Sequence, residues 1–388
     1  MSASESLSAE VIETVLSFLL PSSTLSPILS FAYVSRAWRA GVRRVLFTSL
    51  AISSTSSTRL LLRSLASAPE LQLLSRRLTF VRGARRRPAS TRKGKCVETV
   101  EDAVTPEDVV LLATRLSIES LALRELAFQT FRRRQVNFTL NLPTALTALS
   151  ILGRVADEGF NMHTVGQIVS NLPSLTHLAL RHIQAVPSAL SGLVLPTCTL
   201  SSLALLDTPC LEAAQLRWLL RSTTHAETLR HLAITWHADS PRALNPVRYA
   251  ALRVSHFAVS TTTPGVPESL ALHFPSLRVL QLQSTQSIDP KRLFGNLEGP
   301  LEYLVDRSKI SAGVDPGELA MVLRRAETVS VEGLRAVRVV RTSEELVMAC
   351  VGVGARLEVR ESRRDGSEPY IPPRRVHLST GKRLQIIL

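Results

Sequence analysis

Imidazole and guanidinium side chains recur at two fixed places in a repeated Leu-x-x-Leu-x-Leu pattern. Two of its copies are Leu175-Thr-His-Leu178-Ala-Leu180 and Leu229-Arg-His-Leu232-Ala-Ile234. Neighbouring side chains on a β-strand point to opposite faces, so the residues beside the buried leucines share the other face. Imidazole and guanidinium groups gathered on one face could bind a carboxylate, a phosphate or a metal ion.

The strand register predicts two columns of side chains on this face. Our hypothesis is a binding surface for an acidic or hydroxyl-rich peptide, in which three arginines bind carboxylate or phosphate groups. A solvated sheet face explains the same pattern equally well. The first column reads Arg77, Ser120, Ala148, His177, Ser202, His231, His256, Val279 and Tyr303, and the second reads Val81, Arg124, Leu152, Arg181, Leu206, Thr235, Ser260, Gln283 and Arg307. The predicted substrate-binding residues are Arg124, His177, Arg181, His231, His256, Gln281, Gln283, Tyr303 and Arg307, with Arg124, Arg181 and Arg307 as the anion anchors.

Neither column predicts a metal centre or an active site. His231 and His256 should lie on adjacent strands, but the sequence offers no suitable third ligand, so we interpret both as surface histidines. The chain contains no nucleophile elbow, phosphate-binding glycine loop, zinc-protease motif or Cys-His pair with suitable spacing. We therefore expect a non-catalytic protein without a metal or another cofactor.

The repeat itself predicts the fold. Successive middle positions, from Leu121 to Leu304, are 28, 29, 25, 29, 25, 23 and 24 residues apart. This period is typical of leucine-rich repeats, in which each strand-and-helix unit buries its apolar edge on its neighbours. We expect an α/β solenoid with parallel strands on the concave face and helices on the convex face. Weaker copies are Leu78-Thr-Phe80, Leu301-Glu-Tyr-Leu304, Val329-Ser-Val331 and Leu357-Glu-Val359.

Several segments between the strands carry helix-start signals. Thr105-Pro106, Asp315-Pro316 and Ser343-Glu344 each place a capping oxygen directly before an apolar run. The array is nevertheless irregular, since its unit lengths vary and Asp306 occupies a position that should point inward. Its boundaries beyond Asp306 are the least defined by sequence.

Residues 7–50 have a different pattern, which predicts three short helices. The first is apolar on more than one face, and Pro21 ends it. One face can form a core and another needs a partner, because a module of this size is marginally stable alone. An ordinary helical cap on the following domain is the simpler alternative.

This N-terminal segment resembles an F-box. The resemblance rests on Glu10-Val11, on Val34-Ser-Arg-Ala-Trp38-Arg39 and on the closing Leu46-Phe47. Ser8 stands where the family usually has proline. The resemblance implies docking to the SKP-type adaptor of a cullin-RING ubiquitin ligase, and with the repeats it indicates an F-box/leucine-rich-repeat protein similar to those of fungi. The residues it implies for adaptor binding are Leu7, Ser8, Val11, Ile12, Val15, Leu16 and Trp38.

We therefore predict an F-box-like module at 1–50, a linker and connecting helix at 51–75, and the solenoid at 76–388 with a basic loop at 82–95. Residues 76–95 carry nine basic side chains and no acidic one. The loop lacks aromatic residues, so a solvated or nuclear-import segment is favoured over a nucleic-acid contact. Its predicted basic residues are Arg85, Arg86, Arg87, Arg92, Lys93 and Lys95.

Composition indicates a cytoplasmic or nuclear protein. No secretory signal or membrane span is expected, because no basic residue precedes the first apolar run and prolines interrupt it. The four scattered cysteines, Cys96, Cys198, Cys210 and Cys350, predict reduced thiols. The predicted function is substrate recognition for an SKP-cullin-F-box ligase. The alternatives are a ligase-independent scaffold and, less favoured, a nucleic-acid-binding protein.

Overall fold

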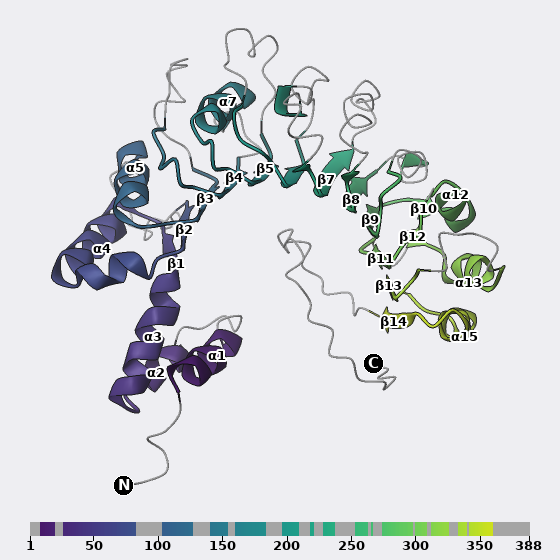
Figure 1. Ribbon diagram of the computed structural model, residues 1–388, viewed down its shortest axis with the longest axis horizontal. Helices are drawn as coiled ribbons and strands as arrows, with labels where there is room; N and C mark the ends of the chain where they lie inside the picture. The colour runs from purple at the N-terminus through teal and green to yellow at the C-terminus, as the bar shows by residue number, and fades with distance from the viewer. Residues whose placement is uncertain are drawn as a thin grey trace, which may run out of the picture. The chain divides into compact units, whose positions relative to one another are not determined.

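The chain divides into two compact units, Met1–Gly159 and Phe160–Leu388, which we describe separately. The computed structural model describes residues 8–19, 26–82, 103–126, 140–153, 160–183, 196–208, 218–220, 228–236, 253–262, 265–266, 274–297, 299–308, 312–325, 333–339 and 341–359. Figure 1 shows the elements in chain order. Within the described residues, no helix is long and apolar enough to cross a membrane.

The first unit begins with the three helices that the sequence predicts. They are α1 (Ala9–Leu19), α2 (Ser26–Phe31) and α3 (Arg36–Thr48). Ile12 and Leu16 of α1 are almost fully buried and pack with Val42 and Val45 of α3. Gly41 lets α1 and α3 approach closely, because a Cβ at this position would lie 2.6 Å from Cγ2 of Ile12.

Side-chain hydrogen bonds cap the N-terminal ends of two of these helices. The side chain of Ser35 accepts a hydrogen bond from the backbone N–H of Trp38 and caps α3. The hydroxyl of Ser8 accepts a hydrogen bond of 3.3 Å from the N–H of Val11, which satisfies a free donor at the start of α1. The ring of Trp38 stacks on Phe31, with the ring centroids 4.9 Å apart, and so joins α2 to α3.

A strand follows α3 without any linker. β1 (Ser49–Ile52) pairs in parallel with β2 (Arg77–Val81), and β3 (Ser120–Arg124) and β4 (Ala148–Leu152) follow in order. The sequence does not predict β1, because Ser49–Ile52 lacks the Leu-x-x-Leu spacing. The helices of this part are α4 (Thr55–Ser67), the 3-10 helix η2 (Pro69–Leu73) and α5 (Pro106–Arg115).

The second unit continues with one parallel strand per repeat. Its helices α7 (Met162–Ser170), α12 (Pro290–Gly295), α13 (Pro316–Arg325) and α15 (Glu344–Gly352) lie on one side of the strands (Figure 1). A short parallel pair, β10 (Ser287–Ile288) and β12 (Gly313–Val314), stands apart. The strands in spatial order are β5 (His177–Arg181), β6 (Ser202–Leu206), β7 (His231–Trp236), β8 (His256–Thr261), β9 (Val279–Ser284), β11 (Tyr303–Asp306), β13 (Ala336–Val339) and β14 (Arg356–Val359).

A shared carbonyl sets the register at most steps along the described strands. The N–H groups of Arg230 and His231 both donate to the carbonyl of Ser201, at 2.9 and 3.0 Å. The N–H groups of Ser255 and His256 donate to the carbonyl of Arg230 in the same way. The middle leucines are therefore aligned from strand to strand. Each unit thus has the leucine-rich-repeat-like α/β fold predicted from the pattern.

The helix-start signals also act as predicted. The hydroxyl of Thr105 accepts from the N–H of Asp108, whose carboxylate accepts from the N–H of Thr105, so the pair forms a capping box at α5. Asp315 accepts a hydrogen bond of 2.9 Å from the N–H of Glu318, and Ser343 caps α15.

The irregular end of the array differs in detail from the prediction. The sequence pattern indicated a weak copy at Val329–Val331, which lies outside the described residues. The strand that pairs with both β11 and β14 is β13, where Leu334, Val337 and Val339 are buried. Valines replace two of the leucines here, and for this reason the sequence pattern did not identify β13 as a repeat strand. Of the four cysteines, Cys198 and Cys350 are described; both are free and buried, and burial raises the pKa of each thiol to about 11.

Asp306 points inward, as its position requires, and the residue is only 3% exposed. It accepts hydrogen bonds from the N–H of Ser308 at 2.9 Å and from the N–H of Val314 at 2.8 Å. Gly313 adopts a φ of +86° beside it, and a Cβ there would collide with the carboxylate and with Ser308. The acid therefore holds β12 against the end of β11.

Replacing Asp306 with alanine should destabilise the second unit. Asp306→Ala leaves two buried N–H groups without their acceptor, which we expect to cost about 2–4 kcal/mol of unfolding free energy. Urea unfolding measures the loss. Asp306→Asn keeps one carbonyl oxygen and should cost less; equal stability of Asp306→Ala and the wild type would contradict this role.

A methyl group at Gly41 should loosen the contact between α1 and α3. Gly41→Ala forces the side chain of Ile12 to move, at an expected cost of about 1–3 kcal/mol. Hydrogen exchange of the α1 and α3 amides measures this local stability. Gly295→Ala is the matched control, because a Cβ there meets nothing within 4 Å, so it should not accelerate exchange in these helices.

Candidate functional site

The strand register brings the predicted columns together within each unit. His177 aligns with Ser202, Ser202 with His231, His231 with His256, His256 with Val279, and Val279 with Tyr303. In the first unit, Arg77 aligns with Ser120 and Ser120 with Ala148. We call the row formed by His177, Ser202, His231, His256 and Tyr303 the histidine face. Ser202, within this row, is buried.

His231 and His256 are neighbours on adjacent strands. Their ring centroids lie 4.4 Å apart, with 38° between the ring planes. Burial, followed by the nearby charges of His231 and Arg278, lowers the pKa of His256 to about 4. Burial also lowers the pKa of His231, to which His177 adds repulsion. Both imidazoles are therefore neutral at pH 7.

Hydroxyl groups orient two of the imidazoles. The hydroxyl of Ser255 lies within hydrogen-bond distance of the carbonyl of Arg230, and its oxygen lies 2.9 Å from Nδ1 of His256. That hydroxyl has one proton, so it donates either to the carbonyl of Arg230 or to Nδ1 of His256, according to the tautomer of the imidazole. Thr176 lies 2.7 Å from Nδ1 of His177 in the equivalent contact.

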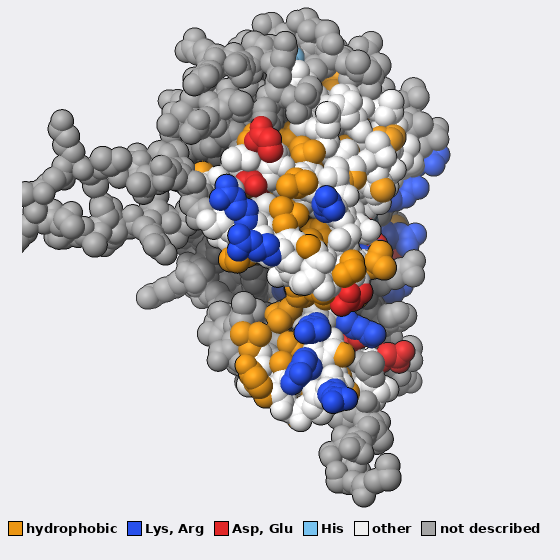
Figure 2. Space-filling model, turned by 90° about the vertical axis from the view of Figure 1, so that its left-hand side faces the viewer, with side chains coloured by type: hydrophobic (Ala, Val, Ile, Leu, Met, Phe, Trp, Pro, Cys, Tyr) orange, Lys and Arg blue, Asp and Glu red, His pale blue; other side chains and the backbone are white. Residues whose placement is uncertain are grey.

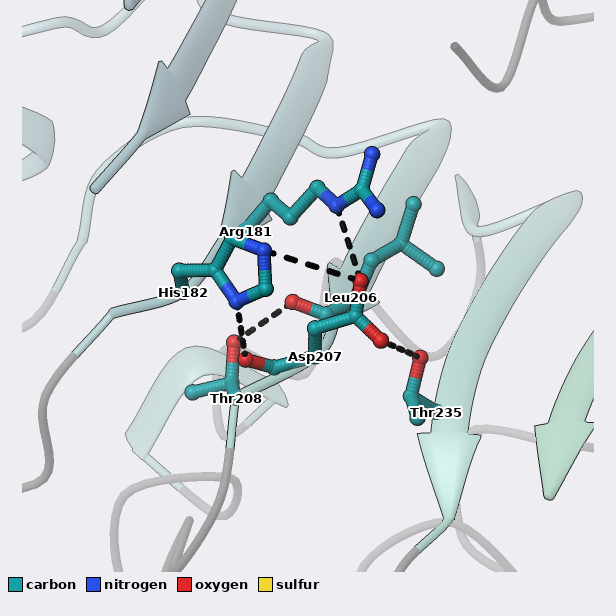
Figure 3. Close-up of polar contacts among 6 residues, drawn as sticks. All are labelled: Arg181, His182, Leu206, Asp207, Thr208 and Thr235. Carbon is teal, nitrogen blue, oxygen red and sulfur yellow. Dashed lines mark hydrogen bonds and ion pairs between the residues drawn. The ribbon is translucent and has the colours of Figure 1, made fainter. Parts of the chain in front are cut away.

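The second column contains a polar cluster that the sequence did not predict. Nε of Arg181 donates to Asp207 at 2.8 Å, and the hydroxyl of Thr235 donates to the other carboxylate oxygen at 3.5 Å (Figure 3). Nδ1 of His182 lies 3.1 Å from the backbone carbonyl of Asp207. His182 and Asp207 directly follow their strands with φ of 52° and 46°, so neighbouring hydrogen bonds hold a left-handed turn.

Asp207 changes the interpretation of Arg181. The sequence suggested a cation available to an anionic ligand, but an acid half-exposed beside it compensates its charge. The terminal guanidinium nitrogens still extend away from Asp207 in Figure 3. Asp207 was missed because its only sequence signal is an acid directly after a strand, where this repeat has no fixed residue type.

The other predicted residues on this face are placed as follows. Arg124 is exposed at the end of β3 in the first unit. Gln283 is exposed, whereas Gln281, Tyr303 and Arg307 are half-buried. The backbone N–H of Arg307 donates to the carbonyl of Leu282 at 2.7 Å, so Arg307 still belongs to the ladder at the end of β11.

No metal centre is found within the part of the chain that the structure describes, since no three His, Cys, Asp or Glu side chains there gather around a common point. The rings of His231 and His256 lie close together but tilted, and no third ligand is found beside them among the described residues. The interpretation of these two residues as ordinary surface histidines stays our preferred one.

A pocket of about 440 Å³ lies at the starts of β11, β13 and β14 and is lined in part by Glu302, Arg335 and Gly354. The carboxylate of Glu302 pairs with Arg278 at 3.3 Å and with Arg335 at 3.7 Å. These ion pairs join consecutive repeats, so we interpret the acid as structural.

The residues that the F-box resemblance implies for adaptor binding divide into two groups. Ile12 and Leu16 form the core of the helical module, whereas Val11 and Val15 are 45% and 41% exposed one turn apart on α1. We call Val11 and Val15 the α1 strip. Trp38 is half-buried against the same core, Ser8 is exposed, and Leu7 lies outside the described residues.

Further exposed apolar residues accompany the α1 strip. Leu29, Tyr33 and Val34, around the turn between α2 and α3, are 47%, 87% and 62% exposed. Figure 2 shows hydrophobic and basic side chains interspersed on the face that it presents. The predicted basic residues from Arg85 to Lys95 lie outside the described residues.

Comparisons with known proteins give no family. No model of a known protein family matches the chain, and no curated protein matches it. Among solved structures, the chain is similar to the crystal structure of a TLR13–ssRNA13 complex, with 13% sequence identity, 79% of this chain covered and a TM-score of 0.34. It spans only 38% of that chain. A similarity of this size carries no argument about function.

The histidine face should make stability depend on pH. His256 takes a proton near pH 6.5 when unfolded but only near pH 4 when folded. The unfolded state therefore binds more protons in this window, and stability should fall from about pH 6.5 to pH 4, by on the order of 1–3 kcal/mol. Urea unfolding at several pH values measures the slope.

His256→Gln is the matched variant, because glutamine keeps a polar side chain without a titrating group. Its stability should fall less over this window than that of the wild type. Above pH 7 the imidazole is neutral in both the folded and the unfolded state. Any difference in unfolding free energy between the variant and the wild type at that pH is therefore due to packing alone. Parallel curves across the whole range would show that His256 is not the source of the slope.

Proposed function

We propose that this chain is the substrate-recognition subunit of an SKP-cullin-F-box ubiquitin ligase. The observation that carries the proposal is the α1 strip: two valines stay exposed on a helix whose other side already forms a core with α3. An exposed apolar strip beside a complete core favours a protein partner. It lies within the segment that resembles an F-box.

The partition within α1 supports this role over that of a simple cap. Ile12 and Leu16 are needed inside the module, so the fold itself explains them. Val11 and Val15 contribute little to that core, and polar residues would serve there equally well if no partner were bound. The exposed Leu29 and Tyr33 extend the apolar surface of the same three helices.

Ser8 stands where the F-box family usually has proline, and its hydroxyl caps the start of α1. Proline at this place would fix the chain direction before α1, whereas Ser8 fixes the helix start through its hydrogen bond to Val11. We infer that Ser8 replaces one start signal with another and leaves the α1 strip in place.

The histidine face and the second column are the proposed substrate surface. The imidazoles of His231 and His256 are neutral at pH 7 and Asp207 compensates Arg181, so this part favours polar, hydrogen-bonding segments of a substrate over strongly acidic ones. Arg124, exposed on the first unit, remains a candidate anchor for an acidic group.

In this proposal the chain makes and breaks no bonds. It holds a substrate near the enzyme that the cullin recruits, which raises the effective concentration of the reacting groups. The adaptor links the chain to the cullin, and the role belongs to the cytoplasm or the nucleus.

Co-expression with an SKP-type adaptor tests the proposal. We expect a stoichiometric complex on gel filtration for the wild type and at least a tenfold weaker one for Val11→Asp/Val15→Asp, because charges would then be buried at the interface. Both valines are exposed, so the double variant should keep its fold, which circular dichroism checks.

Leu111→Asp is the matched control, since Leu111 of α5 is also 41% exposed but lies outside the three-helix module. This variant should bind the adaptor like the wild type. A wild-type chain that elutes alone, folded and monodisperse, in the presence of adaptor would contradict the ligase role and favour the scaffold.

A further inference from the structure

The last described strand, β14, is paired along one edge only. Its register with β13 places Leu357 opposite Val337 and Glu358 opposite Arg338. Among the described residues, no strand pairs with its other edge. Such an edge offers unpaired N–H and C=O groups to another strand.

The hydrogen-bond pattern shows which groups are available. The N–H of Arg356 donates to the carbonyl of Arg335 at 2.8 Å, so Arg356 directs its backbone groups toward β13. Because ladder bonds alternate along a strand, Glu358 faces β13 as well, and Leu357 and Val359 face the open edge. A partner strand centred on Leu357 would therefore find both a donor and an acceptor.

The side chains on this strand have opposite charges two residues apart. Arg356 and Glu358 lie on the same face, with Nε of Arg356 3.4 Å from the carboxylate. Nε of Arg338 donates to the same carboxylate at 2.7 Å. An edge with charges of a single sign would repel its own copy, whereas this edge has one charge of each sign about Leu357.

The repeat that contains α15 and β14 also exposes apolar side chains. Met348 and Val351 of α15 are 60% and 51% exposed, and Val359 is 38% exposed. Among the described residues, no other element covers these side chains, and exposed apolar groups favour contact with a protein partner.

We propose that the open edge of β14 pairs with β14 of a second copy of this chain, in antiparallel orientation about a two-fold axis at Leu357. Leu357 then exchanges two backbone hydrogen bonds with Leu357 of the second copy. Arg356 lies opposite Glu358 of the second copy, and Glu358 opposite Arg356 of the second copy. The contact is self-complementary, as a two-fold interface requires. It does not depend on the proposed ligase role.

Light scattering coupled to gel filtration of the full chain, over a range of concentrations and without adaptor, tests the proposal. We expect a concentration-dependent dimer. In a dimer of Arg356→Glu, acidic side chains would face each other at both cross-strand positions, so we expect dimerisation at least tenfold weaker than in the wild type. Arg356→Lys keeps the positive charge and should retain the dimer. Arg325→Glu, an equal charge change at an exposed position of α13, should have no effect.

Mixing two variants separates edge pairing from damage to the fold. Arg356→Glu and Glu358→Arg should each be monomeric alone, because like charges then face each other. Mixed in equal amounts they should form a heterodimer, since every cross-strand pair becomes opposite in charge. A wild-type monomer at all concentrations, with the edge covered by another part of the chain, would overturn the proposal. So would a dimer that Arg356→Glu leaves unchanged.

Discussion

The carbonyl that each repeat presents to the next one is the interaction on which the array depends. It accepts two successive N–H groups, for example those of Arg278 and Val279 at the carbonyl of Ser255, both at 2.9 Å. Because two successive N–H groups share one acceptor, the next strand begins in register with the preceding one. A shift by one residue would turn every leucine out of the core. The regular face of the sheet follows from this backbone contact, and the side chains on that face are free to vary.

Because these side chains vary, their own surroundings determine the charge of the histidine face. The rings of His231 and His256 lie on adjacent strands with their centroids 4.4 Å apart, and burial lowers the pKa of both, so both are neutral. On the second unit, Asp207 compensates Arg181 and Glu358 compensates Arg338. The column positions alone suggested a cationic groove. At these two arginines, the neighbouring acids reduce the positive charge that the pattern suggested.

The sequence predicted what depends on periodicity and local chemistry. The alignment of His231 with His256 followed from the repeat, and the capping box at Thr105 followed from two residue types at the right spacing. The partition of α1 into buried Ile12 and exposed Val11 could not be predicted, because all its apolar residues look alike until α3 covers one side. β13 escaped detection because valine replaced leucine. Asp207 escaped because its contact with Arg181 joins residues from two repeats.

The helical module continues directly into the sheet of the first unit. α3 ends at Thr48 and β1 begins at Ser49, so the helical module is joined to its sheet without a flexible linker. Within the first unit, a receptor and a scaffold would share this junction, so the junction does not distinguish between them. Only a receptor needs Val11 and Val15 to remain uncovered after the core is complete, and this difference favours the receptor.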